Sequence, residues 1–315
     1  MKRVLIAAAA AALCWSPAAA QPRVDYAKLQ IKTTDLGHGV YLLGWQGGDS
    51  LVLAGDDGVL LVDTSVAPML NNIKAAVVRI SPRPIAFVVN THAHADHFGG
   101  NAALAKSGAV IVGQDNLRER MAKGLYIAAF NQTIPPSPPE ALPTVTYGKA
   151  MTLHFDGETV ELIHAPHAHT DSDTLVFFRR ANVIHASGTF GNDWTYPFYD
   201  LSSGGSLSGV IAAEETMLSL ADDKTRIIAD EGEPSTKAAI QASHDMLVKV
   251  RARVRALIAA GKSEAQAVAA KPTSDLDKTW VHPGGFITGD VATRMAYQSL
   301  KGIKPPTSPP AQTRP

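Results

Sequence analysis

The sequence predicts an α/β protein in which two β-sheets pack face to face and helices cover the outside. Two observations support this fold class. Short strand-like segments fill the first third of the chain and are followed by helical patterns, and the same order returns in the second half. Because the order repeats, we expect two similar halves, although no clear sequence repeat relates them.

The first half begins with three β-rich segments that Gly and Asp residues separate. The Gly-Asp-Asp-Gly stretch between the second and third segments predicts a hairpin turn. A helical hydrophobic repeat follows, and then a continuous apolar run that is typical of a buried strand. The predicted elements are strands at 39–43, 50–54 and 59–62, a helix at 67–80, a strand at 85–90, a helix from Gly99 and a strand at 109–113.

The second half opens with a loop at 131–147 that contains five prolines. Loops of this length are usually functional lids or disordered insertions. Strands and helices then alternate again. The predicted elements are strands at 150–155, 158–164, 173–178 and 181–185, a helix near 206–220, a strand at 225–229 and a helix at 236–260.

Composition and charge restrict the function classes. The 315 residues are 45% hydrophobic and 18% charged, as in an ordinary globular protein. The 29 basic side chains equal the 29 acidic ones in number, whereas a nucleic-acid-binding protein normally carries a basic excess. The sequence therefore predicts no nucleic-acid partner.

The N-terminus has the pattern of a signal peptide at 1–20, with Lys2 and Arg3 before a short apolar run and small residues at 18–20. Cleavage there would also remove Cys14, the only cysteine, and with it any disulfide or thiolate chemistry. No later segment reaches 18 apolar residues. We expect a periplasmic or secreted protein with no membrane association after cleavage, a domain at 21–303 and a disordered tail at 304–315.

One segment, Thr-His-Ala-His-Ala-Asp-His at 91–97, carries the chemistry. It places His92, His94, Asp96 and His97 within six residues, directly after a predicted strand. His92 and His94 alternate, so their side chains point the same way from an extended backbone. Imidazole nitrogen and carboxylate oxygen are common zinc ligands. Without a cation such a cluster would be poorly satisfied, so the motif predicts a metal site.

A second histidine cluster lies at 164–173. A tetrahedral metal site needs a third protein ligand, and His164, His167 or His169 could supply it. Spacing alone does not choose among the three, and surface loop positions are expected for the other two.

These motifs resemble those of the metallo-β-lactamase superfamily. The segment THAHADHFGGN is similar to the His-x-His-x-Asp-His signature, and AHTDSD at 168–173 resembles the motif that supplies the third histidine. The N-terminal hairpins and the strand-end Asp63 also fit, and the resemblance covers roughly residues 35–300. It implies a four-layer αββα sandwich with the site at one edge of the paired sheets.

The resemblance also implies the ligands and the chemistry. His92, His94 and His169 would hold the first metal, and Asp96 and His97 would belong to the second. In the family, metal-bound hydroxide attacks a carbonyl while Asp96 orients the nucleophile. The implied activity is zinc-dependent hydrolysis of a small-molecule substrate: a lactam, lactone or ester, β-lactams included. Subclasses with a cysteine ligand are excluded because the predicted mature chain has none.

Two positions depart from the family pattern. Many relatives have an aspartate that bridges both metals where this chain has Gly188, and a histidine ligand where it has Glu231. Together the two changes keep two anionic ligands, Asp96 and Glu231. A glutamate would make the second site harder, which favours Mn or Fe there over Zn. The alternatives are a weak or empty second site, so that one ion binds, or an inactive enzyme.

Three further interpretations remain open. Trp194, Tyr196 and Phe198 either wall a substrate pocket or pack along a half-buried strand, while structural roles are expected for His185 and His282. The alternative function is a catalytically weak or inactive periplasmic metal-binding protein of the same fold. A di-iron oxidoreductase ranks third, because no segment resembles a flavin partner domain.

Overall fold

The computed structural model describes residues 25–45, 48–192, 195–283 and 285–309. The predicted signal peptide at 1–20 lies outside these residues. Of the predicted tail, 304–309 form neither helix nor strand, and 310–315 are not among the described residues. None of the described helices has the length and apolar character needed to cross a bilayer.

Seven of the described strands form the first sheet, in the order β1-β2-β3-β4-β5-β6-β9. The pairs from β1 to β4 are antiparallel, and those from β4 to β9 are parallel. The bounds are β1 (Lys32–Asp35), β2 (Val40–Gly44), β3 (Ser50–Ala54), β4 (Val59–Val62), β5 (Ile85–Val89), β6 (Val110–Gln114) and β9 (Val145–Tyr147).

Six strands form the second sheet in sequence order, and only the pair β13–β14 is parallel. Their bounds are β10 (Ala150–Phe155), β11 (Glu158–Ala165), β12 (Asp173–Phe178), β13 (Val183–His185), β14 (Arg226–Ile228) and β15 (Ser235–Thr236). A separate hairpin pairs β7 (Leu125–Ile127) with β8 (Gln132–Ile134).

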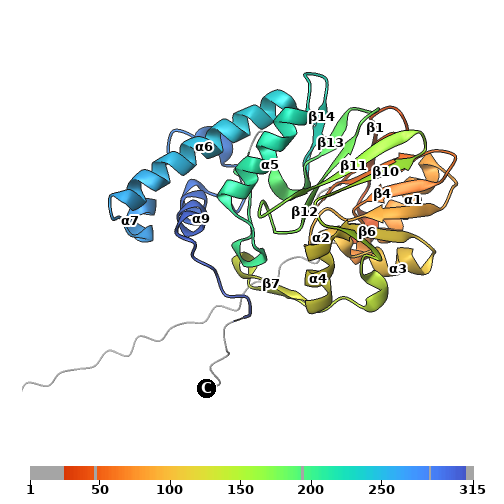
Figure 1. Ribbon diagram of the computed structural model, residues 1–315, viewed down its shortest axis with the longest axis horizontal. Helices are drawn as coiled ribbons and strands as arrows, with labels where there is room; N and C mark the ends of the chain where they lie inside the picture. Colours follow the sequence, from red (N-terminus) through yellow and green to blue (C-terminus); the bar gives the residue numbers. More distant parts are fainter. Residues whose placement is uncertain (1–24, 46–47, 193–194, 284, 310–315) are drawn as a thin grey trace, which may run out of the picture.

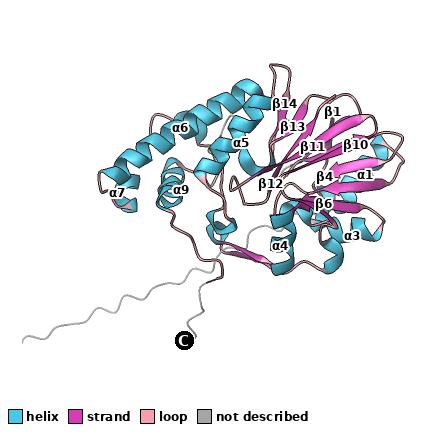
Figure 2. Cartoon of the chain, in the orientation of Figure 1, coloured by secondary structure: helices cyan, strands magenta, loops and turns pink. Residues whose placement is uncertain are grey.

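Helices lie on both outer faces of the paired sheets (Figures 1 and 2). The described helices are α1 (Leu70–Ile80), α2 (Ala95–Phe98), α3 (Asn101–Lys106), α4 (Asp115–Lys123), α5 (Leu207–Leu220), α6 (Lys237–Ala259), α7 (Glu264–Ala269), α8 (Asp277–Trp280) and α9 (Gly289–Lys301). Helix α1 packs on the first sheet, α5 and α6 pack on the second, and α9 packs against α5 and α6. The predicted αββα sandwich is therefore confirmed.

Alternation along the buried strands separates the layers. In β4, Leu60 and Val62 face the second sheet, whereas Val59 and Leu61 pack under α1. In β12, Val176 and Phe178 face the first sheet, whereas Leu175 and Phe177 pack in the cluster that includes α5. Successive side chains of a strand point to opposite faces, so apolar residues at every position bury both faces of these central strands.

The predicted elements match closely. Strands β3 and β4 have the predicted bounds, and α6 begins one residue after the predicted start, where the Thr236 side chain accepts from Ala239 N. The predicted loop at 131–147 is more structured than expected: it contains β8, a short 3-10 helix and β9, which extends the first sheet.

A buried acid in the helical layer gives a stability prediction. The Glu214 side chain of α5 is buried, and its one described hydrogen bond comes from Ser243 Oγ at 2.6 Å. Burial raises the pKa of Glu214 well above its ordinary value of 4.5, while the hydrogen bond from Ser243 opposes this. The folded state therefore retains a proton that the unfolded chain loses above pH 4.5, and stability falls as pH rises from there towards the folded pKa.

We expect Glu214→Gln to remove this pH dependence. Relative to the variant, the wild type should lose about 1.4 kcal/mol of unfolding free energy for each pH unit above 4.5, up to the folded pKa. Urea unfolding at pH 5.5 and pH 8 measures the difference. The control is Glu215→Gln, because the Glu215 side chain is 60% exposed. The prediction would be contradicted if the unfolding free energies of the wild type and Glu214→Gln changed by the same amount between the two pH values.

Candidate metal centre

The predicted site residues gather where several strands end. His92, His94 and His97 follow β5 directly, and the chain turns into α2 within this segment. The loop from β11 to β12 supplies His169, and Asp230 follows β14. Because β4 and β5 are parallel, as are β13 and β14, their carboxyl ends bring these side chains to one edge of the paired sheets.

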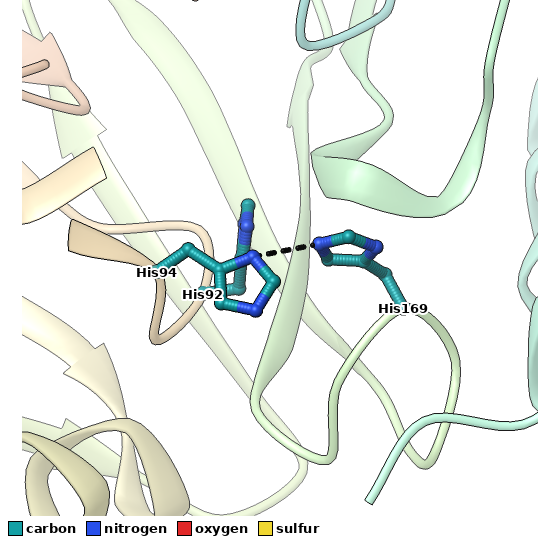
Figure 3. A group of neighbouring side chains, drawn as sticks. All are labelled: His92, His94 and His169. Atoms are coloured by element: carbon teal, nitrogen blue, oxygen red, sulfur yellow. Dashed lines mark hydrogen bonds between the residues drawn. The ribbon is translucent and has the colours of Figure 1, made fainter. Parts of the chain in front are cut away.

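Three histidines form the first group of candidate ligands. His92, His94 and His169 are buried, and one ring nitrogen of each lies within 4.8 Å of the others. Figure 3 shows the three rings converging, with His94 Nδ1 and His169 Nε2 3.0 Å apart. His164 and His167 instead contact the backbone oxygens of Asp171 and Gly204, so the structure brings only His169 of the second cluster to this group.

The partners of His94 and His169 determine which nitrogens face the group. His169 Nδ1 donates to Phe198 O at 2.8 Å, and His94 Nε2 lies 3.3 Å from the Asp200 carboxylate. Both partners accept hydrogen bonds, so the protons belong on these outer nitrogens. The inner nitrogens then present lone pairs to each other at 3.0 Å. A cation resolves this contact, and such outer partners are typical of metal-ligating histidines.

The free nitrogen of His92 points to the same conclusion. His92 is fully buried, and its Nδ1 lies 3.0 Å from Thr91 Oγ1. No described group forms a hydrogen bond with its Nε2. Burial and the neighbouring His97 and His169 lower the pKa of His92 well below 6.5, so the ring is neutral. A neutral, buried and unpaired imidazole nitrogen is suited to bind a metal.

A second group consists of His92, His97 and Asp230. His97 Nε2 lies 3.8 Å from Asp230 Oδ2 and 3.6 Å from Asp96 Oδ2. The other oxygen of Asp230 is buried without a described partner. The carboxylates and the imidazole therefore surround a point next to the first group, and this donor set suits a second divalent cation.

Asp63 orients His97. It directly follows β4 and has a positive φ of 61°, and its carboxylate accepts from Thr91 N, Thr91 Oγ1 and His97 Nδ1 at 2.7–2.8 Å. The Nδ1 proton is thereby fixed, and Nε2 faces Asp230 and Asp96. Burial opposes the charged form of His97, but the carboxylates of Asp63 and its neighbours raise its pKa to about 10. Without a metal this ring keeps a proton that a cation would displace.

The sequence pattern alone did not reveal Asp200 and Asp230. Asp200 is buried and lies 106 residues from His94, with no recognisable spacing to the histidine motif. The sequence pattern predicts Glu231, the neighbour of Asp230, as a ligand, but the structure leaves Glu231 exposed and outside both ligand groups. Glu231 does line the adjacent cavity. Its role as a metal ligand remains a prediction.

The comparisons with known proteins agree with this geometry. A family model described as the metallo-beta-lactamase superfamily matches residues 43–227, more than half of the chain. The chain belongs to the metallo-β-lactamase superfamily. The match includes the histidine motif, His169 and Gly188, and it ends just before Asp230 and Glu231.

Solved structures show the same superfamily fold. A stereoselective inverting sec-alkylsulfatase from Pseudomonas sp. is 17% identical with a TM-score of 0.68, covering 90% of this chain and 52% of that one. The chain therefore spans about half the length of that alkylsulfatase. A metallo-β-lactamase from Pontibacter korlensis is 16% identical with a TM-score of 0.57, covering 70% of this chain and 99% of that one. The DIM-1 metallo-β-lactamase is 13% identical with a TM-score of 0.55 over the same shares.

Gly188 lies against a candidate ligand of this superfamily site. It belongs to the 3-10 helix Ser187–Thr189, directly after β13. A Cβ at this position would lie 2.3 Å from His169 Cδ2 and 2.7 Å from His169 Nε2. Contacts this short are not tolerated, so neither an aspartate nor any other side chain fits at position 188 while His169 keeps its place.

Gly188→Ala is therefore expected to displace the His169 ring and weaken zinc binding at least about tenfold, the lower bound for disturbing the surroundings of a metal ligand. Calorimetric titration of the metal-free protein with zinc measures the effect. Gly148→Ala is the matched control, because a Cβ there meets only Asp115 Oδ2, at 3.6 Å. Unchanged zinc affinity in Gly188→Ala would show that His169 is not a ligand in this position.

A cavity of about 890 Å³ opens beside the metal centre. His169, Gly188 and Asp230 form part of its wall, so a bound molecule can reach both ligand groups.

Of the predicted aromatic cluster, Tyr196 and Phe198 line this cavity, whereas Trp194 lies outside the described residues. Tyr196 is nonetheless buried and donates to Asp277, while His185 is fully buried and accepts from Ser187 N. His282 also lines the cavity.

Proposed function

We propose that the protein is a zinc-dependent hydrolase that cleaves a carbonyl substrate of the lactam, lactone or ester class. The observation that supports this most strongly is the convergence of three buried histidine nitrogens, with an oxygen partner on the other nitrogen of each ring, beside a large cavity. Superfamily membership fits this proposal but does not name a substrate, because one fold serves many reactions.

The side chains present fit one or two divalent cations. His92, His94 and His169 would hold the first, and His97, Asp230 and Asp96 would hold the second. A bound zinc ion lowers the pKa of water to about 7 and polarises a carbonyl oxygen. The imidazole ligands of the first group suit Zn. The two carboxylates make the second site harder, so Mn or Fe are alternatives to Zn there.

Asp96 is the proposed catalytic residue. Its side chain is 51% exposed, unlike the buried histidines, and it lies 3.6 Å from His97 Nε2. The surrounding histidines, against the effect of burial, lower the pKa of Asp96, so it is ionised at neutral pH. An ionised carboxylate at this position can take a proton from an attacking water and return it to the leaving group.

A catalytically weak metal-binding protein is the second candidate. The observation that favours it is Gly188. Many proteins of the family carry a metal-bridging aspartate at this position, and the structure leaves no room for one here. Purified protein loaded with zinc, manganese or iron separates the candidates in a panel of lactams, lactones, carboxylic esters and sulfate esters. Metal-dependent turnover of a carbonyl substrate supports the hydrolase. Tight metal binding without turnover of any member supports the second candidate.

We also propose that the protein is exported and cleaved after Ala20. The charged start, the short apolar run and the small residues at 18–20 support this. N-terminal sequencing of protein recovered from the exported fraction should begin at Gln21. An intact Met1 on cytoplasmic protein would contradict the proposal.

A further inference from the structure

The cavity beside the metal centre has two chemically different walls. Phe190, Phe198, Phe286 and Ile287 contribute apolar surface. The other wall is acidic, with Asp49, Asp230, Glu231 and Glu233. A molecule that reaches the candidate metal ligands must therefore place its parts against one wall or the other.

The aromatic wall is assembled from distant parts of the chain and reaches the metal centre. Phe198 lies 5.5 Å from the His169 ring and 5.4 Å from the Phe286 ring, centre to centre. Phe130 completes the cluster at 5.1 Å from Phe286. Phe286 and Phe130 are 52% and 47% exposed. Exposed aromatic side chains that gather beside a ligand site mark a surface that an apolar group can cover.

The acidic wall offers little to a negatively charged molecule. Lys32 is the only lysine or arginine among the described lining residues, and its ammonium group already pairs with Glu233 at 2.5 Å. Asp49 is buried, and one of its carboxylate oxygens has no described hydrogen-bond partner. Away from the candidate metal ligands, a carboxylate on a substrate would thus find no unpaired lysine or arginine among the described lining residues, which is unfavourable.

We propose that the substrate is an uncharged ester or lactone with an apolar arm that lies on Phe198 and Phe286. This inference rests on the proposed hydrolase function and specifies its substrate class. The carbonyl group reaches the metal centre next to His169, while the arm follows the aromatic wall towards the exposed edge of Phe286. A carboxylate at the far end of the arm is disfavoured, because that end lies on Phe286 and the one lysine among the described lining residues is paired with Glu233.

The first experiment compares matched substrates on the zinc-loaded protein. p-Nitrophenyl butyrate, hexanoate and octanoate test the length of the arm. Mono-p-nitrophenyl hexanedioate has the same acyl length as the hexanoate but ends in a carboxylate. We expect kcat/KM to rise up to about fourfold per added methylene, the full value for burying one. We expect the terminal carboxylate to lower it at least tenfold.

The variants locate the arm. Phe286→Ala should flatten the dependence of kcat/KM on the length of the acyl chain. Val78→Ala is the matched control, because Val78 is 68% exposed on α1, which covers the first sheet. Its chain-length dependence should equal that of the wild type.

The second experiment does not depend on turnover. Saturation-transfer NMR measures binding of octanamide and acetamide to the metal-free protein. Octanamide should bind at least tenfold more tightly than acetamide, and Phe286→Ala should remove most of the difference.

The two experiments separate the proposals. If the esters are hydrolysed without regard to chain length, or if the hexanedioate ester is preferred, the substrate assignment is overturned while the hydrolase function stands. If neither these esters nor any lactam or lactone of the panel is hydrolysed but octanamide binding depends on Phe286, the hydrolase proposal fails and the apolar subsite stands. If octanamide and acetamide bind equally, the subsite is overturned.

Discussion

His94→Ala is expected to lower zinc affinity and hydrolytic activity by more than about a hundredfold. Loss of a residue that merely supports a ligand costs about 10–100-fold, and the loss of a ligand itself should cost more. The variant removes Nδ1, which lies 3.0 Å from His169 Nε2, and leaves the Asp200 carboxylate without its histidine partner. Zinc content after dialysis and kcat/KM on the best ester or lactone of the panel measure the two effects.

The control for this prediction is a histidine elsewhere in the fold. His154 is exposed on β10, and its Nδ1 lies 3.3 Å from Thr159 Oγ1. His154→Ala should therefore retain zinc and activity. Thermal unfolding of both variants in the absence of metal shows whether either substitution disturbs the fold. Retention of full zinc content by a folded His94→Ala protein would disprove the assignment of the three-histidine site.

The strands of the core could be predicted because their sequence signal is strong and local. β3 and β4 are apolar at almost every position, since each has one face against the other sheet and one under α1. The turn between them is marked by Gly and Asp. The local hydrophobic pattern of such a segment is sufficient to identify it as a strand, so its bounds can be predicted from the sequence.

Elements with few buried residues could not be predicted, because their sequence signal is weak. Helix α4 buries only Leu117 and Met121, so its hydrophobic repeat is too sparse to stand out. β9 has three residues, of which only Tyr147 is buried, and it follows a segment rich in proline. It forms a strand because β6 offers a free parallel edge, and that partner is not visible in the local sequence.

The same distinction applies to the site. Three histidines and a carboxylate within six residues indicate a metal site without any knowledge of the rest of the fold. Asp200 and Asp230 reach the site from more than 100 residues away, through the folding of the second half onto the first. The distinction between Asp230 and Glu231 depends on a single residue of register after β14. That register is fixed by Asp49 N, which donates to Asp230 O at 2.7 Å.

This register places the Asp230 carboxylate among the candidate ligands of the second metal ion. Its Oδ2 lies 3.8 Å from His97 Nε2, its Oδ1 is buried without a described partner, and its side chain is 26% exposed. Burial and the neighbouring carboxylates, Asp63 first, raise the pKa of Asp230 to about 6, against the effect of His97. A divalent cation between the carboxylates would relieve this repulsion.

Asp230→Asn is expected to weaken the second zinc ion by more than about a hundredfold, since a ligand is lost, and to leave the first ion bound to the three histidines. Asparagine keeps the shape of the side chain and the backbone contact with Asp49, so the fold should be retained. Calorimetric titration of the metal-free protein with zinc resolves the two ions if both bind. Activity on the best carbonyl substrate shows whether the second ion is needed.

Glu231→Gln in the same titration decides between the two neighbouring carboxylates. The alignment with family patterns predicts that Glu231 is the ligand, whereas the structure groups Asp230 with His92 and His97 and leaves Glu231 exposed. We therefore expect Glu231→Gln to change the affinity of the second ion by less than about threefold, because an exposed charge acts through solvent. If Glu231→Gln instead loses the second ion and Asp230→Asn keeps it, the carboxylate at position 231 turns inward when metal binds, and the assignment of Asp230 is wrong.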